Sequence, residues 1–175
     1  MSLILRPASL SDAPQLSELM QLAITELQAD VLTPAQVEAS RMGMGLDTRL
    51  IEDGTYFVVE CDTRVAGCGG WSRRATLYGG NHSGGRDARL LDPLTERARI
   101  RAMYTHPDFV RRGVGTMILK ASEEAARAEG FGATEMAATL AGKPFYERCG
   151  YRVERAFTDN QGAVGVPLFV MVRGL

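Results

Sequence analysis

Short apolar runs alternate with amphipathic stretches along the whole chain. The runs have the length and composition of strands and cover 3–6, 56–61, 65–71, 98–106, 133–139, 151–157 and 166–172. A turn at Asp62 and Thr63 joins the second and third runs, so we expect these two strands to form a hairpin.

Spacings of three and four residues mark the predicted helices. The stretch 11–28 places its apolar residues on one face, and Asp12 precedes it as a candidate cap. A shorter helix is predicted at 33–42, and the strongest helical pattern covers 113–129. The segment "GKPFYERCG" at 142–150 predicts a last, short helix.

The stretch 73–96 contains glycine pairs and has no clear period, which predicts a long loop. Strands and helices alternate after it. The pattern therefore predicts an α/β or α+β fold, with a mixed sheet and helices on both faces. A chain of 175 residues fits one domain, 1–175.

Composition excludes several classes of protein. The net charge of -1 and the lack of a basic stripe argue against nucleic-acid or membrane-surface binding. No apolar run has the length of a membrane span or of a signal peptide. Cys61, Cys68 and Cys149 lack CxxC spacing, which favours reduced thiols and a cytoplasmic protein. With only His82 and His106, we expect no metal site.

The segment "HPDFVRRGVGT", between a predicted strand and a predicted helix, is typical of a phosphate site. Glycines let the backbone approach a ligand, and a helix N-terminus offers free amides to an anion. A nucleotide-triphosphate loop would need a lysine after its last glycine, but Thr116 follows Gly115 directly. A dinucleotide-binding turn would need a third glycine where Ile118 stands. The plain alternative is a strand-to-helix turn with solvated arginines.

Two motifs in this order resemble the GNAT superfamily of acetyl-CoA-dependent N-acetyltransferases. "VRRGVGT" is similar to the family pattern Q/R-x-x-G-x-G/A, and "GKPFYERCGY" is similar to A-x-x-F-Y-x-x-x-G-F/Y. The order of the predicted elements also matches across essentially the whole chain. The resemblance implies a mixed, mostly antiparallel sheet of about seven strands with helices on both faces.

For function, the resemblance implies transfer of an acetyl group from acetyl-CoA, as cosubstrate, to a primary amine of a small molecule or protein. It carries the cofactor-binding role onto nine residues: Met103, Tyr104, Thr105, Arg111, Arg112, Gly113, Val114, Gly115 and Thr116. The chain departs from the family at Val110, where Gln or Arg is usual. It departs again at Ala138 and Thr139, where many members carry an asparagine.

Tyr146 is the candidate catalytic residue, because the family tyrosine commonly protonates the departing thiolate. The alternative is that Phe145 and Tyr146 are both core aromatics. The base that accepts the proton of the amine is not evident, since an alkylammonium of pKa about 10.4 must lose a proton. Glu96, Tyr104 and a water chain are the candidates.

Arg99, Arg101 and Met103 are expected on one face of their strand. Ile100, Ala102 and Tyr104 are expected on the other. Charged side chains on a central strand need partners. These partners are either nearby acids, such as Asp92 or Glu96, or an acidic substrate covered by the loop at 78–93 as a lid.

Four further residues are expected to have structural roles rather than catalytic ones. Cys149 is interpreted as a packing residue, Cys68 and Trp71 as core or pocket wall, and His82 as a loop residue rather than a base.

Two functions stay open, an N-acetyltransferase and a non-catalytic acyl-CoA-binding sensor. The C-terminal strands suggest a homodimer.

Overall fold

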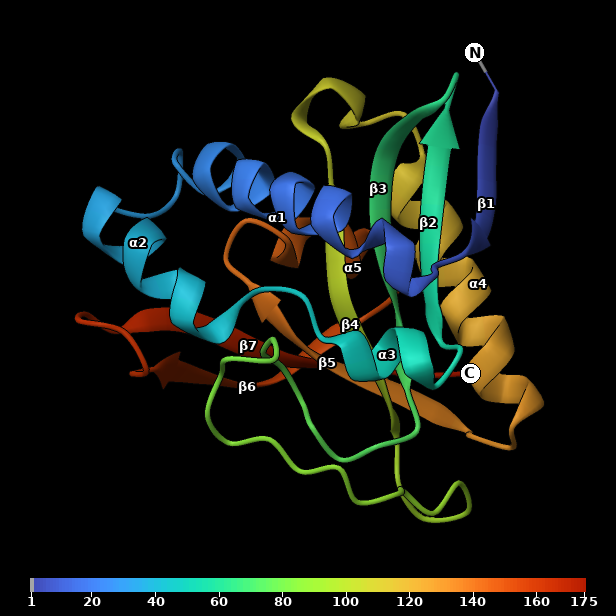
Figure 1. Cartoon of the computed structure of the whole chain (residues 1–175). Coiled ribbons are helices and arrows are strands. Elements are labelled where there is room, and N and C mark those ends of the chain that lie inside the picture. The colour runs from blue at the N-terminus through green and yellow to red at the C-terminus, as the bar shows by residue number, and fades with distance from the viewer. Residues whose placement is uncertain (1) are drawn as a thin grey trace.

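The computed structural model describes residues 2–175 and contains one seven-stranded mixed sheet in the order β1-β2-β3-β4-β5-β7-β6 (Figure 1). The only parallel pair in this order is β4 with β5. The strands are β1 (Leu3–Pro7), β2 (Tyr56–Cys61), β3 (Arg64–Ser72), β4 (Ala98–Thr105), β5 (Ala133–Thr139), β6 (Arg152–Asp159) and β7 (Val166–Gly174). This sheet confirms the predicted fold class.

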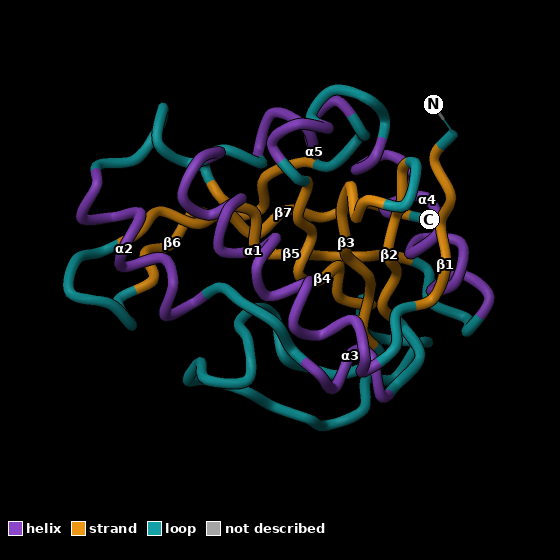
Figure 2. The backbone as a smooth tube through the Cα atoms, turned by 45° about the horizontal axis from the view of Figure 1, so that its top comes forward, coloured by secondary structure: helices purple, strands orange, loops and turns teal. Residues whose placement is uncertain are grey.

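Helices cover both faces of the sheet. They are α1 (Ala13–Leu27), α2 (Pro34–Gly43), α3 (Thr48–Glu52), α4 (Val114–Ala128) and α5 (Lys143–Arg148), with 3-10 turns η1 (Leu10–Asp12) and η2 (Pro107–Phe109). Buried side chains of α1, α2 and α3 pack in one cluster, whereas those of α4 pack in two others. Figures 1 and 2 show α1 to α3 on one side of the sheet and α4 on the other.

Hydrophobic patterning accounts for most of these elements. In α1 the predicted face is the buried one, because Leu16, Leu19, Met20 and Ala23 are at most 5 % exposed. The hairpin turn falls at Asp62 and Thr63, both with positive φ, as a two-residue type I′ connection requires.

One local prediction was wrong, and one helix was missed. The Asp12 side chain makes no capping hydrogen bond to α1; its carboxylate accepts hydrogen bonds from Arg6 Nη1 and Nη2, each at 2.9 Å. The two charge-assisted bonds hold both carboxylate oxygens against Arg6 instead of the amides of α1. The helix α3 was not predicted, because its five residues are too few to show a period.

The strand β4 carries a bulge at Ala102, which has a φ of +49°. The register to β3 shifts there, so that Gly70 pairs with Arg101 and Cys68 pairs with Tyr104. A bulge inserts one residue and exchanges the two faces of the strand beyond it. The expected sharing of faces was therefore wrong: Met103 lies on the α4 side, whereas Tyr104 packs with α1.

The sheet divides between β4 and β5. These strands pair only through Ala98 with Thr134 and Arg99 with Glu135. Beyond Arg99 the two strands have no ladder between them, and the β5 side of β4 is free to face a ligand. The predicted long loop is confirmed: it contains no strand or helix and only one isolated bridge, between Arg74 and Leu90.

Candidate functional site

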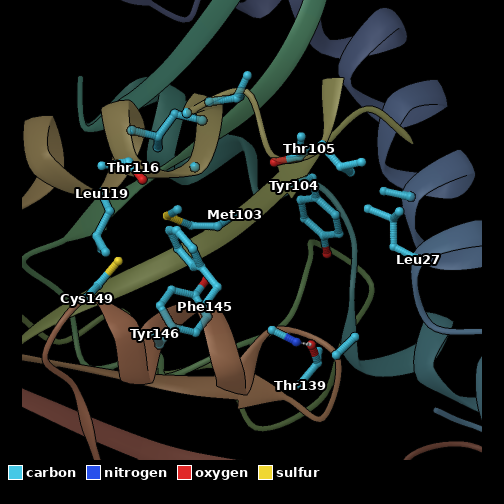
Figure 3. A pocket seen from close by; sticks show the side chains of 18 of the residues that line it. Leu27, Met103, Tyr104, Thr105, Thr116, Leu119, Thr139, Phe145, Tyr146 and Cys149 are labelled. Atoms are coloured by element: carbon cyan, nitrogen blue, oxygen red, sulfur yellow. Dashed lines mark hydrogen bonds between the residues drawn. The ribbon is translucent and has the colours of Figure 1, made fainter. Parts of the chain in front are cut away.

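A cavity of about 1100 Å³ opens where β4 and β5 part. Its walls come from the ends of β4 and β5, the side of α4 that runs from Val114 to Arg127, the helix α5 and the C-terminal half of α1. Figure 3 shows Tyr104 and Leu27 on one side of this pocket and Leu119 and Cys149 on the other. The volume exceeds the usual range for small-molecule sites, about 300–1000 Å³, and suits a long ligand.

The turn before α4 presents free backbone amides to this cavity. Arg111 and Gly113 have φ of +62° and +86°, and this left-handed pair turns the chain sharply into the helix. The first helical amide bond runs from Met117 N–H to Gly113 O, at 3.0 Å. The N–H groups of 113–116 therefore have no partner within the helix and can bind an anion.

Two glycines allow the surrounding elements to pack closely. A Cβ at Gly115 would lie 3.1 Å from Cζ of Phe145, so α5 sits directly against the first turn of α4. A Cβ at Gly67 would lie 2.5 Å from Cγ1 of Val114, so α4 can rest on β3 only because residue 67 lacks a side chain. Both contacts fix the position of the free amides.

The structure brings the predicted cofactor-binding residues together, with one exception. These line the cavity: Met103, Tyr104, Thr105, Arg111, Gly113, Val114, Gly115 and Thr116. Arg112 is not part of the wall; its guanidinium lies over the ring of Phe109, 5.5 Å from the centroid. Val114 is 1 % exposed and offers only its backbone.

The ladder between β3 and β4 determines which β4 amides are free. His106 N–H bonds to Ala66 O at 2.9 Å, and the register pairs Thr105 with Gly67 and Tyr104 with Cys68. Antiparallel pairs alternate between bonded and non-bonded, so Tyr104 bonds to β3 and the Thr105 amide points the other way. Thr105 is part of the cavity wall and offers its N–H there.

Tyr146 lies on α5 at the base of the cavity (Figure 3). It is 9 % exposed and packs edge-on to Phe145 and Tyr151, with centroids 5.1 and 6.0 Å away. Burial raises the pKa of its phenol well above the ordinary value, so it stays protonated at neutral pH. Its hydroxyl makes no hydrogen bond to residues 2–175, which leaves it free for a ligand.

Tyr104 is also buried in the wall, but its hydroxyl is occupied. It accepts a hydrogen bond from Gly45 N–H at 3.1 Å, and burial raises the pKa of the phenol well above its usual range. A raised pKa makes the phenolate costly, which argues against Tyr104 as a base at neutral pH.

Glu96 lies outside the cavity wall, on the loop that precedes β4. Its carboxylate accepts hydrogen bonds from Arg89, at 2.9 and 3.0 Å, and these lower its pKa to about 2. Its place outside the wall and its low pKa argue against Glu96 as the base.

The two arginines of β4 have protein partners, but not the acids that were expected. Arg99 pairs with Glu135 on β5, and Arg101 pairs with Asp47 at 3.0 Å. Asp92 and Glu96 were therefore the wrong partners, because Asp47 and Glu135 lie far away in sequence and close in space. Burial lowers the pKa of Arg101.

Asp47 is held ionised between two arginines. Burial opposes its charge, but the hydrogen bond from Arg86 and the charge of Arg101 outweigh burial and lower its pKa. The three groups form a network that anchors the start of α3 to β4 and to the long loop.

For Cys149, Cys68, Trp71 and His82, the expected structural roles agree with the structure. Burial raises the pKa of Cys149, so its thiol is a poor nucleophile, although it lines the cavity. Cys68 and Trp71 are at most 2 % exposed and belong to the core. His82 Nε2 lies 2.7 Å from Arg41 O, outside the cavity wall.

Sequence reasoning missed two polar residues beside the site, Gln28 and Asp159. Both are less than 5 % exposed and line a smaller cavity that adjoins the large one. Gln28 was part of the amphipathic pattern of 11–28, and Asp159 lies two residues beyond the strand predicted at 151–157, so neither stood out. Within 2–175 no group of three or more potential metal ligands occurs. None of the described helices is long and apolar enough to cross a membrane.

Comparison with known structures gives the class of protein. The GCN5-related N-acetyltransferase from Rhodopseudomonas palustris is similar over 100 % of this chain and 97 % of its own, with a TM-score of 0.74 and 21 % identity. The PaiA N-acetyltransferase from Thermoplasma acidophilum, in complex with coenzyme A, is similar over 100 % of both chains, with a TM-score of 0.69 and 15 % identity. These similarities show the acyl-CoA N-acyltransferase fold.

The family model of the GNAT acetyltransferase domain matches residues 52–153, more than half of the chain. The chain therefore belongs to the GNAT acetyltransferase family. The matched segment runs from the end of α3 to β6 and contains the turn before α4 and Tyr146. No curated protein is significantly similar in sequence to this chain.

Proposed function

We propose that this protein transfers the acetyl group of acetyl-CoA to a primary amine by direct attack on the thioester. The observation that carries this proposal is the common wall shared by the free amides of 113–116, the Thr105 N–H and the Tyr146 hydroxyl. The first group fits a pyrophosphate, the second a developing oxyanion, and the third a departing thiolate.

The residues present fit coenzyme A in charge and shape. Glu123 and Glu124 line the α4 part of the cavity, where they pair with Arg173 and Lys120. The basic side chains of Lys120, Arg127 and Arg148 line the α4 and α5 parts as well. Together with the helix N-terminus they favour a polyanionic ligand at this end. Two of the solved relatives were determined with coenzyme A or acetyl-CoA, in the second case the YncA putative acetyltransferase from Salmonella typhimurium, with a TM-score of 0.65, 16 % identity, and coverage of 100 % of this chain and 95 % of its own.

In the proposed reaction the amine nitrogen attacks the thioester carbonyl, and a C–N bond forms as the C–S bond breaks. The Thr105 N–H stabilises the oxyanion, and Tyr146 gives its phenolic proton to the sulfur. Glu96 and Tyr104 are unsuitable as bases, so water at the cavity mouth takes up the proton of the amine and returns a proton to the Tyr146 phenolate.

The test is release of free thiol from acetyl-CoA with a panel of primary amines. An N-acetyltransferase releases thiol only when an amine is present and forms the N-acetyl product in equal amount. Tight binding of acetyl-CoA without amine-dependent release would instead favour the non-catalytic sensor.

A further inference from the structure

A small cavity of about 130 Å³ adjoins the thioester end of the large one. The two share Gln28, Met44, Met103, Tyr104, Thr139 and Tyr146. Apolar side chains form much of the remaining wall, among them Met136, Val166 and Leu168. A short aliphatic chain that starts beside Tyr146 would therefore continue into this small cavity.

Gln28, at the border of both cavities, has an unsatisfied acceptor. Its Nε2 donates to Ser40 Oγ at 3.1 Å, and Ser40 Oγ donates its own proton to Val37 O at 2.7 Å. Since Ser40 can then only accept from Gln28, the orientation of the amide is fixed. Its Oε1 is buried without a partner, the only such side-chain atom in 2–175.

Asp159 is a second buried acceptor without a compensating charge. It is 4 % exposed and accepts one hydrogen bond, from the Tyr78 hydroxyl to Oδ1 at 3.0 Å. Within 2–175 it forms no ion pair, although a buried carboxylate is usually paired. Its Oδ2 lies against Gly43, where a Cβ would come within 2.5 Å.

The surroundings of these two residues favour a positive charge. Gln28 is the C-cap of α1, and α2 ends at Gly43, next to Oδ2 of Asp159, so the C-termini of both helices adjoin the small cavity. The C-terminus of a helix carries partial negative charge. Arg101 also lines this cavity, but its guanidinium donates to Asp47 Oδ2 at 3.0 Å and to Gly79 O at 2.6 Å and forms no ion pair with Asp159.

We infer that the small cavity binds the far end of the acceptor, and that this end carries a second positive charge. The acceptor is a short aliphatic amine with an ammonium or guanidinium group that pairs with Asp159. Gln28 Oε1 accepts a hydrogen bond from the reacting amine. This inference rests on the proposed function and names the substrate class of the same site.

The test compares three probes of equal length: 1,4-diaminobutane, n-butylamine and 4-aminobutanoate, together with the homologues of three to six carbons. We expect kcat/KM for the preferred diamine to exceed that of its alkylamine by about 10-fold or more, as loss of one charged hydrogen bond implies. Equal values at every length would overturn the inference.

Asp159→Asn keeps the shape of the side chain and an acceptor for Tyr78 while it removes the charge. We expect the ratio of diamine to alkylamine to fall toward one, with the KM for acetyl-CoA unchanged. Glu26→Gln removes one exposed charge from α1 and serves as the control. A preserved ratio in Asp159→Asn would contradict the pairing, and the wild-type series stands as a test even if this variant fails to fold.

Gln28→Leu removes Oε1, the acceptor that has no partner among the described residues. Ser40 keeps its bond to Val37, so we expect folding stability to be unchanged or higher, while the KM of every amine rises about 10-fold. An unchanged KM would mean that Gln28 does not contact the acceptor.

Binding separates this inference from the proposed function. If no amine supports thiol release, calorimetric titration of the coenzyme-A-loaded protein with 1,4-diaminobutane and n-butylamine still measures the subsite. Turnover of amines without a preference for the diamine would refute the subsite alone.

Discussion

Arg101 illustrates how single residues of β4 serve the fold rather than a ligand. Its guanidinium donates to Asp47 Oδ2 at 3.0 Å and to Gly79 O at 2.6 Å, and only 2 % of the side chain is exposed. Because the Arg101 guanidinium and the Asp47 carboxylate bind each other inside the protein, no free guanidinium is left to bind an acidic acceptor. The structure thus favours pairing over the acidic-substrate alternative.

Arg101→Met leaves Asp47 buried with only Arg86. We expect the free energy of unfolding in urea to fall by about 3–5 kcal/mol, because one partner of a buried pair is removed. Turnover of 4-aminobutanoate relative to n-butylamine should not fall. Arg49→Met is the control, since it breaks an exposed pair with Glu52 and should cost at most about 1 kcal/mol. A selective loss of 4-aminobutanoate turnover would restore the acidic-substrate hypothesis.

Asp12 makes the free energy of unfolding depend on pH in the acidic range. Hydrogen bonds from Arg6 lower its pKa from 3.8 to about 2 in the folded state. Its contribution is therefore complete above the unfolded pKa and is lost as pH falls from about 4 to 2. Urea unfolding between pH 5 and 2 should show a shallower loss of stability in Asp12→Asn than in wild type. Identical slopes would show that the pair with Arg6 is not formed.

The role of a residue can be predicted from the sequence only where the residues that it acts with are close to it in the chain. The glycines and Tyr146 stand in contiguous motifs, so their positions could be predicted. Asp47, Glu135 and Asp159 act through neighbours that are distant in sequence, and no local pattern marks them.

Among the elements, the turn before α4 carries the strongest conformational demand. Gly113 has a φ of +86°, and a Cβ there would meet nothing within 4 Å. A side chain at this position is thus opposed by backbone strain and not by crowding. The same turn sets the direction of the four free amides.

Gly113→Ala should destabilise the protein by about 1–2 kcal/mol through the left-handed conformation, and weaken coenzyme A binding by about 10-fold. Gly132→Ala is the matched control, because its surroundings are equally open and its φ is ordinary. Calorimetry with coenzyme A gives the affinity and urea unfolding the stability. Equal affinity in both variants would remove the turn from the binding site.

The bulge in β4 shows where element prediction from sequence stops. The strand itself was expected from its composition, but Ala102 gives no sign of a positive φ, and strict alternation then assigns the wrong faces beyond it. The bulge arises from tertiary packing: Tyr56 donates its hydroxyl proton to Ala102 O at 2.6 Å.

At the scale of the whole molecule, the divided sheet is the feature that makes a site. Motifs in the right order predicted the family and the seven-stranded sheet, because each motif occurs at a junction of a strand and a helix. The size of the cavity and its smaller extension depend on how the layers pack, which the sequence does not display.

Coenzyme A should stabilise the whole fold, since it binds across β4, α4 and α5. At 100 times the dissociation constant the gain is about 2.7 kcal/mol, or a rise in Tm of about 5–10 °C. Differential scanning fluorimetry with and without coenzyme A measures it, with adenosine as the control lacking the pyrophosphate. No shift with coenzyme A would contradict the proposed binding site.

The central claim is that Tyr146 protonates the departing thiolate in an acetyl transfer. The most direct measurement is amine-dependent thiol release by wild type and Tyr146→Phe at saturating acetyl-CoA, with coenzyme A affinity determined in parallel. The account predicts that Phe lowers kcat by about 100-fold or more while affinity is retained. An unchanged kcat in Tyr146→Phe would contradict it.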